Sequence, residues 1–199
     1  MTPAIAPPRC ADPLFDIVFL DRDGTINTRL PRYVTTPAEL DLLPGVGEAV
    51  AALNRSGARV VLVTNQRGVA TGELDLDQVD KVHSALKGLL SLSGAWLDHI
   101  FVCPHEDGTC GCRKPAPGLF EKALAAAPWA DPARCVMIGD MVSDVEPAAS
   151  LGMATVLLGP GRECDDGWGR AASLPDAVRR LLERQPIETD RSTTSAPGD

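Results

Sequence analysis

Short apolar runs alternate along the chain with longer segments in which apolar residues recur every three or four positions. The apolar runs, each bounded by polar residues, glycine or proline, cover residues 16–20, 59–64, 99–103, 135–139 and 154–159. Runs of this length that are rich in Val, Ile, Leu and Phe are typical of strands buried on both faces of a parallel sheet. We therefore predict five parallel strands.

The periodic segments predict helices at residues 45–56, 75–92, 117–127, 144–151 and 175–184. In the second segment, Val79, Val82 and Leu86 form one apolar stripe, which is typical of a helix with one buried face. Asp75 precedes this stripe and Gln78 follows three residues later, a pair that marks a helix N-terminus. Strands that alternate with helices predict a three-layer α/β fold around a parallel sheet.

The chain has 199 residues, a length that fits one domain. We place this domain at residues 14–185. The stretches outside it, residues 1–12 and 187–199, are rich in proline and in small and polar residues, so we expect them to be poorly ordered. The helix patterns show no second apolar seam, which favours a monomer.

Polar residues follow the predicted strands at the points where these strands end. Asp21 and Asp23 follow the first strand, Thr64 ends the second, and Asp140 follows the fourth. Lys114 lies in the connection after the third strand. Because ligands bind at the carboxyl ends of parallel strands, we expect these side chains to share one site.

The two carboxylates Asp21 and Asp23 can divide the work of a phosphoryl transfer. One attacks phosphorus and forms an acyl phosphate, and the other protonates the leaving oxygen and then accepts a proton from water. An anionic nucleophile needs a cation beside an anionic phosphate, and Mg²⁺ with oxygen ligands fits that need. We predict that Asp21, the carbonyl of Asp23 and Asp140 hold it. The alternative is a structural Asp-x-Asp-Gly turn or a calcium-binding loop, but no Glu stands at the last position of such a loop.

Four further polar residues fit the same chemistry, although each also has an ordinary structural role. Thr64 can donate to a phosphoryl oxygen, or it can be a satisfied strand residue. Lys114 can compensate charge on the phosphoryl group and Arg113 can bind a second anionic group, or both can be solvated surface cations. Asp144 can orient Lys114 or cap the following helix.

The connection after the third strand carries Cys103, His105, Cys110 and Cys112. Three sulfurs and one imidazole fill the tetrahedral shell that Zn²⁺ prefers, and four protein ligands leave no open position. We therefore predict a structural zinc site, which would fix the direction of Arg113 and Lys114 directly after Cys112. Four unrelated loop residues are the alternative.

The composition limits the class of protein. The formal net charge is -8, which argues against a nucleic-acid partner because no broad basic surface can form. The sequence contains no apolar run long enough to span a membrane and no signal-peptide pattern, so we expect a cytoplasmic protein with reduced thiols. Cys10, Cys135 and Cys164, with His83 and His99, show no partner pattern and are interpreted as structural or incidental.

These motifs resemble those of the haloacid dehalogenase superfamily, and residues 19–159 are similar to its histidinol-phosphatase and heptose-bisphosphatase branch. The resemblance rests on Asp-Arg-Asp-Gly-Thr-Ile-Asn, Thr-Asn-Gln followed by Gly-Val-Ala-Thr-Gly, and Cys-Arg-Lys-Pro-x-Pro-Gly. It implies a Rossmann-like sheet without a large cap domain.

The resemblance also implies residue roles. Asp21 is the nucleophile, Asp23 the acid and base, Thr64 and Lys114 the phosphoryl stabilisers, and Asp140 a Mg²⁺ ligand. Arg113 is a substrate contact. We expect Tyr33, Asn65, Gln66 and Arg67 to line the substrate as well.

Two departures from the family pattern concern charge. Met141 follows Asp140 where the family often carries Lys, and Arg67 follows Thr-Asn-Gln where a small residue is usual. Arg67 can replace the missing cation or meet a second phosphate.

The expected activity is removal of the C7 phosphate from a heptose bisphosphate, a small phosphorylated sugar. A histidinol-phosphate or other sugar-phosphate phosphatase is the alternative, and the acidic balance weighs against a polynucleotide 3'-phosphatase. A zinc-stabilised binding module without catalysis is the alternative of another class, and the complete set of catalytic residues argues against it.

Overall fold

The computed structural model describes residues 4–8, 13–159 and 169–183, which fold around six parallel strands. In chain order these are β1 (Ile17–Leu20), β2 (Arg59–Asn65), β3 (His99–Cys103), β4 (Cys135–Gly139), β5 (Ala154–Leu158) and β6 (Gly169–Ala171). Their order across the sheet is β3-β2-β1-β4-β5-β6. The first five strands confirm the predicted ones to within one residue at either end.

The strand β6 was missed by the sequence analysis. It has three residues, Gly-Arg-Ala, and pairs with β5 at the edge of the sheet. An edge strand this short carries no run of apolar residues, so no hydrophobic pattern distinguishes it from a loop.

The five predicted helices are present: α1 (Val46–Arg55), α2 (Leu76–Ser91), α3 (Gly118–Ala126), α4 (Val142–Ser150) and α5 (Leu174–Leu182). Short 3-10 turns are η1 (Pro37–Glu39), η2 (Arg67–Val69) and η3 (Pro132–Arg134). The expected start of α2 is confirmed, because Asp75 accepts a hydrogen bond from the backbone of Gln78 at 2.7 Å. The helix α4 begins two residues earlier than predicted, which places Asp144 in its first turn.

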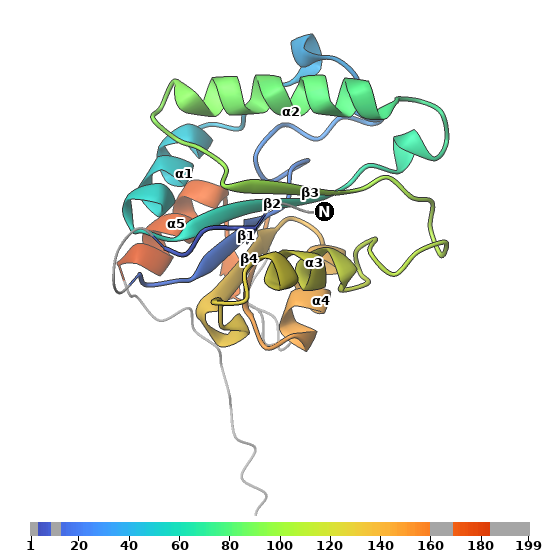
Figure 1. Cartoon of the computed structure of the whole chain (residues 1–199). Helices are drawn as coiled ribbons and strands as arrows, with labels where there is room; N and C mark the ends of the chain where they lie inside the picture. Colours follow the sequence, from blue (N-terminus) through green and yellow to red (C-terminus); the bar gives the residue numbers. More distant parts are fainter. Residues whose placement is uncertain (1–3, 9–12, 160–168, 184–199) are drawn as a thin grey trace, which may run out of the picture.

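The sheet separates two hydrophobic cores. Alternate residues of β1 point to opposite faces: Val18 and Leu20 pack with α1, α2 and α5, whereas Phe19 packs with α3 and α4. Figure 1 shows α2 on one side of the sheet and α3 and α4 on the other. The three-layer α/β fold is thereby confirmed.

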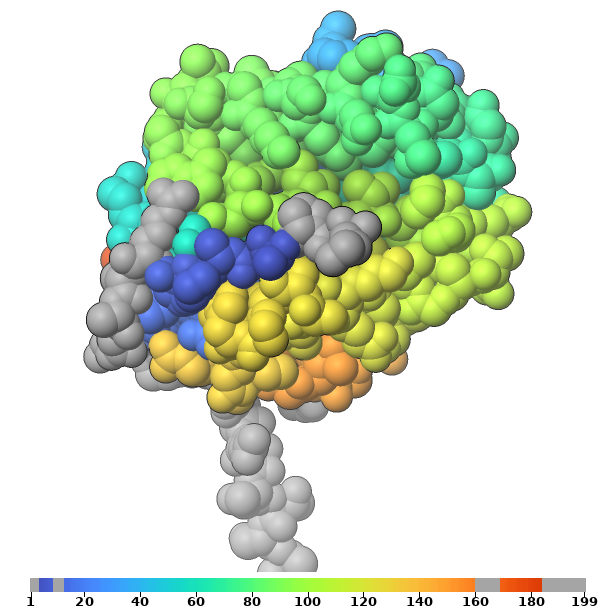
Figure 2. All heavy atoms as spheres, viewed as in Figure 1, coloured from blue at the N-terminus to red at the C-terminus, as the bar shows by residue number. Residues whose placement is uncertain are grey.

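The N-terminal residues 4–8 pack against the domain, although we expected residues 1–12 to be poorly ordered. Ile5 is 4% exposed, its backbone N–H donates to Ala126 O at 2.8 Å, and its carbonyl accepts from Trp129 Nε1 at 2.9 Å. Figure 2 shows this segment (blue) lying against the yellow segment that contains these partners. The apolar side chain and two hydrogen bonds compensate the lost chain entropy. The other residues that we expected to be poorly ordered, 1–3, 9–12 and 187–199, lie outside the described residues.

The strand register brings the predicted polar clusters to one edge of the sheet. Leu20 lies opposite Leu62 on β2 and Ile138 on β4, so the residues that follow all three emerge together. Between β1 and α1 the described chain forms η1, turns and isolated bridges at Asn27, which leaves this edge without a cap domain, as predicted. No helix within the described ranges is long and apolar enough to cross a membrane.

Candidate active site

Lys114 lies at the centre of the site, and its ammonium group is surrounded by oxygens. Nζ donates to Asp21 Oδ1 at 2.7 Å and to the carbonyl of Val63 at 2.8 Å, and it lies 2.7 Å from Asp144 Oδ1. The three ammonium hydrogens therefore have three acceptors. Since the lysine side chain is 1% exposed, it holds Asp21 in one orientation. Asp144 also accepts from the backbone of Met141 at 3.0 Å, so it fills both of its expected roles.

The carboxylates outnumber the cations at this buried position. Oxygens of Asp21, Asp140 and Asp144 all lie within 4.8 Å of one another. Burial raises the pKa of Asp21 to about 7 against the lowering effect of Lys114, and Asp144 raises it further. Burial lowers the pKa of Lys114, but Asp21 and Asp144 outweigh burial and keep that pKa above its usual range. The lysine stays charged, and a second cation is needed to balance the group.

The oxygen donors at this position fit Mg²⁺, which prefers carboxylate and carbonyl ligands. A positive charge is already stable there: Arg29 Nη2 lies 2.8 Å from the carbonyl of Asp23 and 2.9 Å from both oxygens of Asp140. Gly24 has φ +90°, and a Cβ on it would lie 2.2 Å from Asp140 Oδ2. Glycine is therefore required for the chain to turn this close to the carboxylate.

Asp23, the candidate acid and base, is held by three donors. Its carboxylate accepts from Arg22 Nη2 at 2.9 Å, Asn27 Nδ2 at 3.0 Å and Gln66 Nε2 at 3.1 Å. Burial raises the pKa of Asp23, but Arg22 and these hydrogen bonds outweigh burial and lower that pKa overall. Gln66 also donates to Thr64 Oγ1 at 2.9 Å, so one amide orients both the Asp23 carboxylate and the Thr64 hydroxyl.

The sequence analysis missed the contact between Arg22 and His83, which holds Arg22 in place beside Asp23. Arg22 is fully buried, and its Nη1 lies 3.3 Å from His83 Nε2 on α2. Burial, with the neighbouring charge of Arg22, lowers the pKa of His83 to about 3, so this imidazole is a neutral acceptor. His83 was interpreted as a residue without a partner, because its partner is 61 positions away in the chain. His99 stacks on Phe101 with ring centroids 4.5 Å apart.

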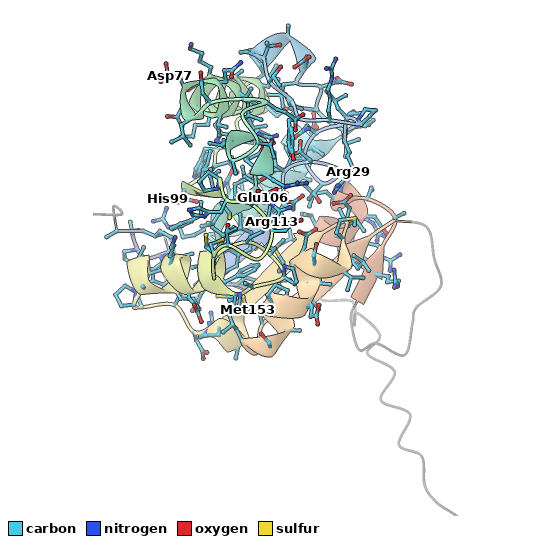
Figure 3. All side chains as sticks on the ribbon, turned by 90° about the vertical axis from the view of Figure 1, so that its right-hand side faces the viewer. Arg29, Asp77, His99, Glu106, Arg113 and Met153 are labelled. Carbon is cyan, nitrogen blue, oxygen red and sulfur yellow. The ribbon has the colours of Figure 1, made fainter. Side chains whose placement is uncertain are left out.

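A cavity of about 500 Å³ opens above the two carboxylates. Of the expected substrate contacts, Tyr33, Asn65 and Arg113 line it, together with Arg29 and Arg32. Figure 3 looks onto this side of the molecule, where Arg29 comes from the loop after β1 and Arg113 from the connection after β3. Three guanidinium groups therefore line the cavity. In this conformation Arg29 pairs with Asp140, and Arg113 pairs with Asp107.

The other two expected substrate contacts take different places. Gln66 is fully buried, so in this conformation it positions its neighbours and does not face the cavity. Arg67 pairs with Glu106 at 2.9 Å on the exposed rim, and the guanidinium beside Asp140 belongs instead to Arg29. Nothing in the sequence pattern distinguished Arg29 from other loop arginines, because its role depends on how the loop folds back onto β4.

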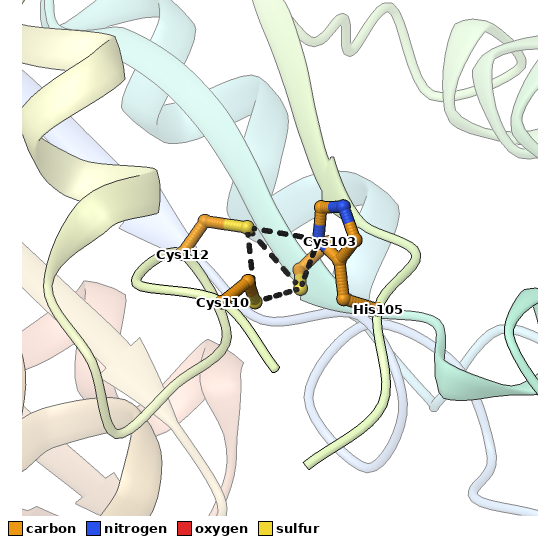
Figure 4. A group of neighbouring side chains, drawn as sticks. All are labelled: Cys103, His105, Cys110 and Cys112. Carbon is orange, nitrogen blue, oxygen red and sulfur yellow. Dashed lines mark hydrogen bonds between the residues drawn. The ribbon is translucent and has the colours of Figure 1, made fainter. Parts of the chain in front are cut away.

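The connection after β3 brings its three cysteines and one histidine together (Figure 4). The Sγ of Cys112 lies 3.4 Å from the Sγ of Cys103 and of Cys110, and 3.2 Å from His105 Nδ1. A tetrahedral shell with Zn–S bonds of about 2.3 Å places neighbouring sulfurs about 3.8 Å apart, so the observed separations fit one metal ion.

The pKa values of the cysteine thiols also favour a metal site at this cluster of three cysteines and one histidine. Burial raises the pKa of the Cys103 thiol to about 12. Burial also raises the pKa of Cys110, but backbone N–H groups of Cys112 and Arg113 help to lower it overall to about 6. Three sulfurs this close become thiolates together only when a metal cation stabilises them. Cys135 is buried in β4, whereas Cys10 and Cys164 lie outside the described residues.

Comparison with known proteins agrees with this geometry. Residues 15–152 match the family of haloacid dehalogenase-like hydrolases. The chain is 37% identical over 166 residues to the D-glycero-beta-D-manno-heptose-1,7-bisphosphate 7-phosphatase of Bordetella bronchiseptica, which covers 82% of this chain and 90% of that protein. It is also 37% identical over 139 residues to the D-glycero-alpha-D-manno-heptose-1,7-bisphosphate 7-phosphatase of Mycobacterium tuberculosis, covering 69% of this chain and 73% of that protein.

A solved structure of a similar protein was determined with ligands. It is the D,D-heptose 1,7-bisphosphate phosphatase from B. bronchiseptica complexed with magnesium and phosphate. The TM-score is 0.78 and the identity 32%, and the match covers 84% of this chain and 98% of the other.

Proposed function

Since the chain belongs to the haloacid dehalogenase-like hydrolases and is a phosphatase, we propose that it removes the C7 phosphate of D-glycero-D-manno-heptose 1,7-bisphosphate through an aspartyl-phosphate on Asp21. The observation that carries the proposal is the placement of Asp21, which is fixed by Lys114 at 2.7 Å and faces the cavity beside Asp23. A bound Mg²⁺ held by Asp21, the Asp23 carbonyl and Asp140 would lower the charge repulsion between the carboxylate and the phosphate.

The reaction runs in two steps. Asp21 attacks phosphorus, the bond between phosphorus and the sugar oxygen breaks, and Asp23 gives its proton to that oxygen. Asp23 then takes a proton from water, the water oxygen attacks phosphorus, and inorganic phosphate leaves while Asp21 is regenerated. The low pKa of Asp23 in the described conformation rises when a negatively charged phosphate enters beside it, which supplies the protonated form.

Lys114 and Thr64 stabilise the transferring group. Lys114 lies next to the nucleophile and keeps its charge, so it neutralises negative charge that develops on the phosphoryl oxygens. The hydroxyl of Thr64 accepts a hydrogen bond from Gln66, which leaves its own proton free to be donated to a phosphoryl oxygen.

The substrate class follows from the cavity and the relatives. An open space of about 500 Å³ with guanidinium groups on its wall fits a small molecule that carries a second anionic group. Arg113 is the proposed contact for the C1 phosphate, and Tyr33 and Asn65 are proposed contacts for the sugar. The relatives named above act on the alpha or the beta anomer, and both anomers are therefore substrates to test.

The sulfur cluster is proposed to hold a structural Zn²⁺ with Cys103, His105, Cys110 and Cys112 as its ligands. The cluster ends immediately before Arg113 and Lys114. A metal that fixes Cys112 thereby fixes the backbone that carries the two catalytic cations.

Phosphate release in the presence of Mg²⁺ tests the proposed function. The panel holds both anomers of heptose 1,7-bisphosphate, histidinol phosphate and several hexose phosphates. We expect a preference of at least about tenfold in kcat/KM for one heptose anomer, equivalent to about 1.4 kcal/mol of transition-state binding. A flat profile or a preference for histidinol phosphate would exclude the heptose assignment.

A further inference from the structure

Arg29 occupies a position that a divalent cation also needs. Its Nη2 donates to the carbonyl of Asp23 at 2.8 Å and to both carboxylate oxygens of Asp140 at 2.9 Å. These are two of the three groups proposed to hold Mg²⁺. Bound Mg²⁺ lies about 2.1 Å from its oxygen ligands, so an ion that bridges the Asp23 carbonyl and Asp140 takes the place where this nitrogen lies.

The side chain of Arg29 is able to leave this position. It is 47% exposed, whereas Lys114, the other cation of the site, is 1% exposed. Arginine has a long flexible stem, and an ion pair this exposed contributes little to stability. Of the two cations, Arg29 is therefore the one that a metal ion displaces.

A displaced Arg29 remains beside the substrate. Its side chain lines the same cavity as Asp21, Tyr33 and Arg113. Its guanidinium stays charged after displacement, because arginine is not deprotonated in proteins. An anionic substrate in this cavity offers the released guanidinium new acceptors.

We propose that Arg29 competes with the divalent cation for Asp140 and the Asp23 carbonyl and, once displaced, holds an anionic group of the substrate. The substrate part of this inference rests on the proposed function, whereas the competition with the metal does not. Arg29 thereby keeps the buried carboxylates balanced before the metal binds and adds to substrate affinity afterwards.

The test compares Arg29→Met with Arg32→Met, an arginine of the same loop that lines the cavity. Mg²⁺ is titrated by calorimetry into the full-length zinc-containing protein, without substrate. We expect Arg29→Met to tighten Mg²⁺ binding about threefold to fivefold, because removal of an exposed competing ion pair has an effect of this size. Arg32→Met should change it less than about twofold.

The second measurement is the KM at saturating Mg²⁺, with whichever phosphate ester of the panel is hydrolysed fastest. Arg29→Met should raise KM about fivefold, since a charged hydrogen bond to the substrate is lost. An unchanged Mg²⁺ affinity or an unchanged KM in Arg29→Met overturns the proposal. Failure of the heptose assignment appears separately, as a change in which ester is preferred.

Discussion

Two groups of ionisable side chains, which the chain joins at Cys112 and Lys114, balance their charge differently. The lysine site is Lys114 with Asp21 and Asp144, and the sulfur cluster is the set of three cysteines and His105. Around Lys114, the protein supplies its own cation, which pairs with Asp21 and Asp144 at 2.7 Å. In the sulfur cluster, the side chains that contact each sulfur in the described part of the chain are the other cysteines and His105. The first group is balanced in part by the protein's own lysine, whereas we propose that the second is balanced by a bound Zn²⁺.

The location of each group in the fold explains this difference. Asp21 and Asp144 follow or begin regular elements, and the buried strands around them exclude water. The sulfur cluster lies on a connection without regular structure, where only Cys103 belongs to a strand. A loop that cannot bury enough apolar surface gains its order from metal binding instead.

The largest expected effect is on turnover, in Asp21→Asn. We expect kcat to fall by about three orders of magnitude or more because the nucleophile is lost. The fold should persist, since the amide keeps an oxygen acceptor for Lys114. Phosphate release and circular dichroism measure the two properties, with the exposed Asp77→Asn as control. Residual turnover near the wild-type level would exclude the covalent mechanism.

The next largest effect is on stability, in Lys114→Met. Removing the cation leaves the carboxylates of Asp21 and Asp144 buried without the positive charge that pairs with them, and breaking a buried pair in this way costs about 3 kcal/mol or more. Urea unfolding measures the free energy of unfolding, and Lys122→Met, an exposed lysine on α3, is the control. Equal stabilities of the two variants would show that the lysine site does not depend on its own cation.

The sulfur cluster should respond to loss of a metal ligand. We expect about one zinc per chain in protein purified without added metal, and a reduced zinc content in Cys110→Ser, because a tetrahedral site loses one of its four ligands. Elemental analysis measures the metal, and Thr109→Ser in the same loop is the control. Zinc content near zero in the wild-type protein would contradict the assignment.

The activity of Cys110→Ser tests whether the sulfur cluster supports the lysine site. We expect turnover to fall by about tenfold, through a looser backbone at Arg113 and Lys114, while Asp21 is untouched. A variant that loses zinc but retains full activity would show that the loop and the lysine site are independent.

The smallest expected effect is on the pH dependence of stability, through the contact of His83 with Arg22 beside Asp23. The pKa of His83 is about 3 in the folded protein and about 6.5 when unfolded. The neutral imidazole therefore contributes stability that is present above pH 6.5 and is lost as the pH falls toward 3. In His83→Gln this loss should be smaller, by about 1 kcal/mol at about pH 5.8 relative to pH 7.5. Chemical unfolding at the two pH values measures it, and equal losses in both proteins would contradict the prediction.

The sequence by itself determined the positions of five strands and five helices, because burial on one or both faces leaves a periodic pattern in the chain. It also determined which residue types follow each strand, and hence that Asp21, Thr64 and Asp140 meet at one edge. The cysteine spacing predicted the sulfur cluster, since all of its members lie within one short segment.

The tertiary structure alone decided contacts between residues far apart in the chain. Arg29 meets Asp140 across 111 positions, and Arg22 meets His83 across 61. A short edge strand and the packing of Ile5 on the domain also left no periodic signal. Periodicity records whether a position is buried, but it does not record which distant partner lies against it, and the partners of charged side chains are set by how the loops fold over the sheet.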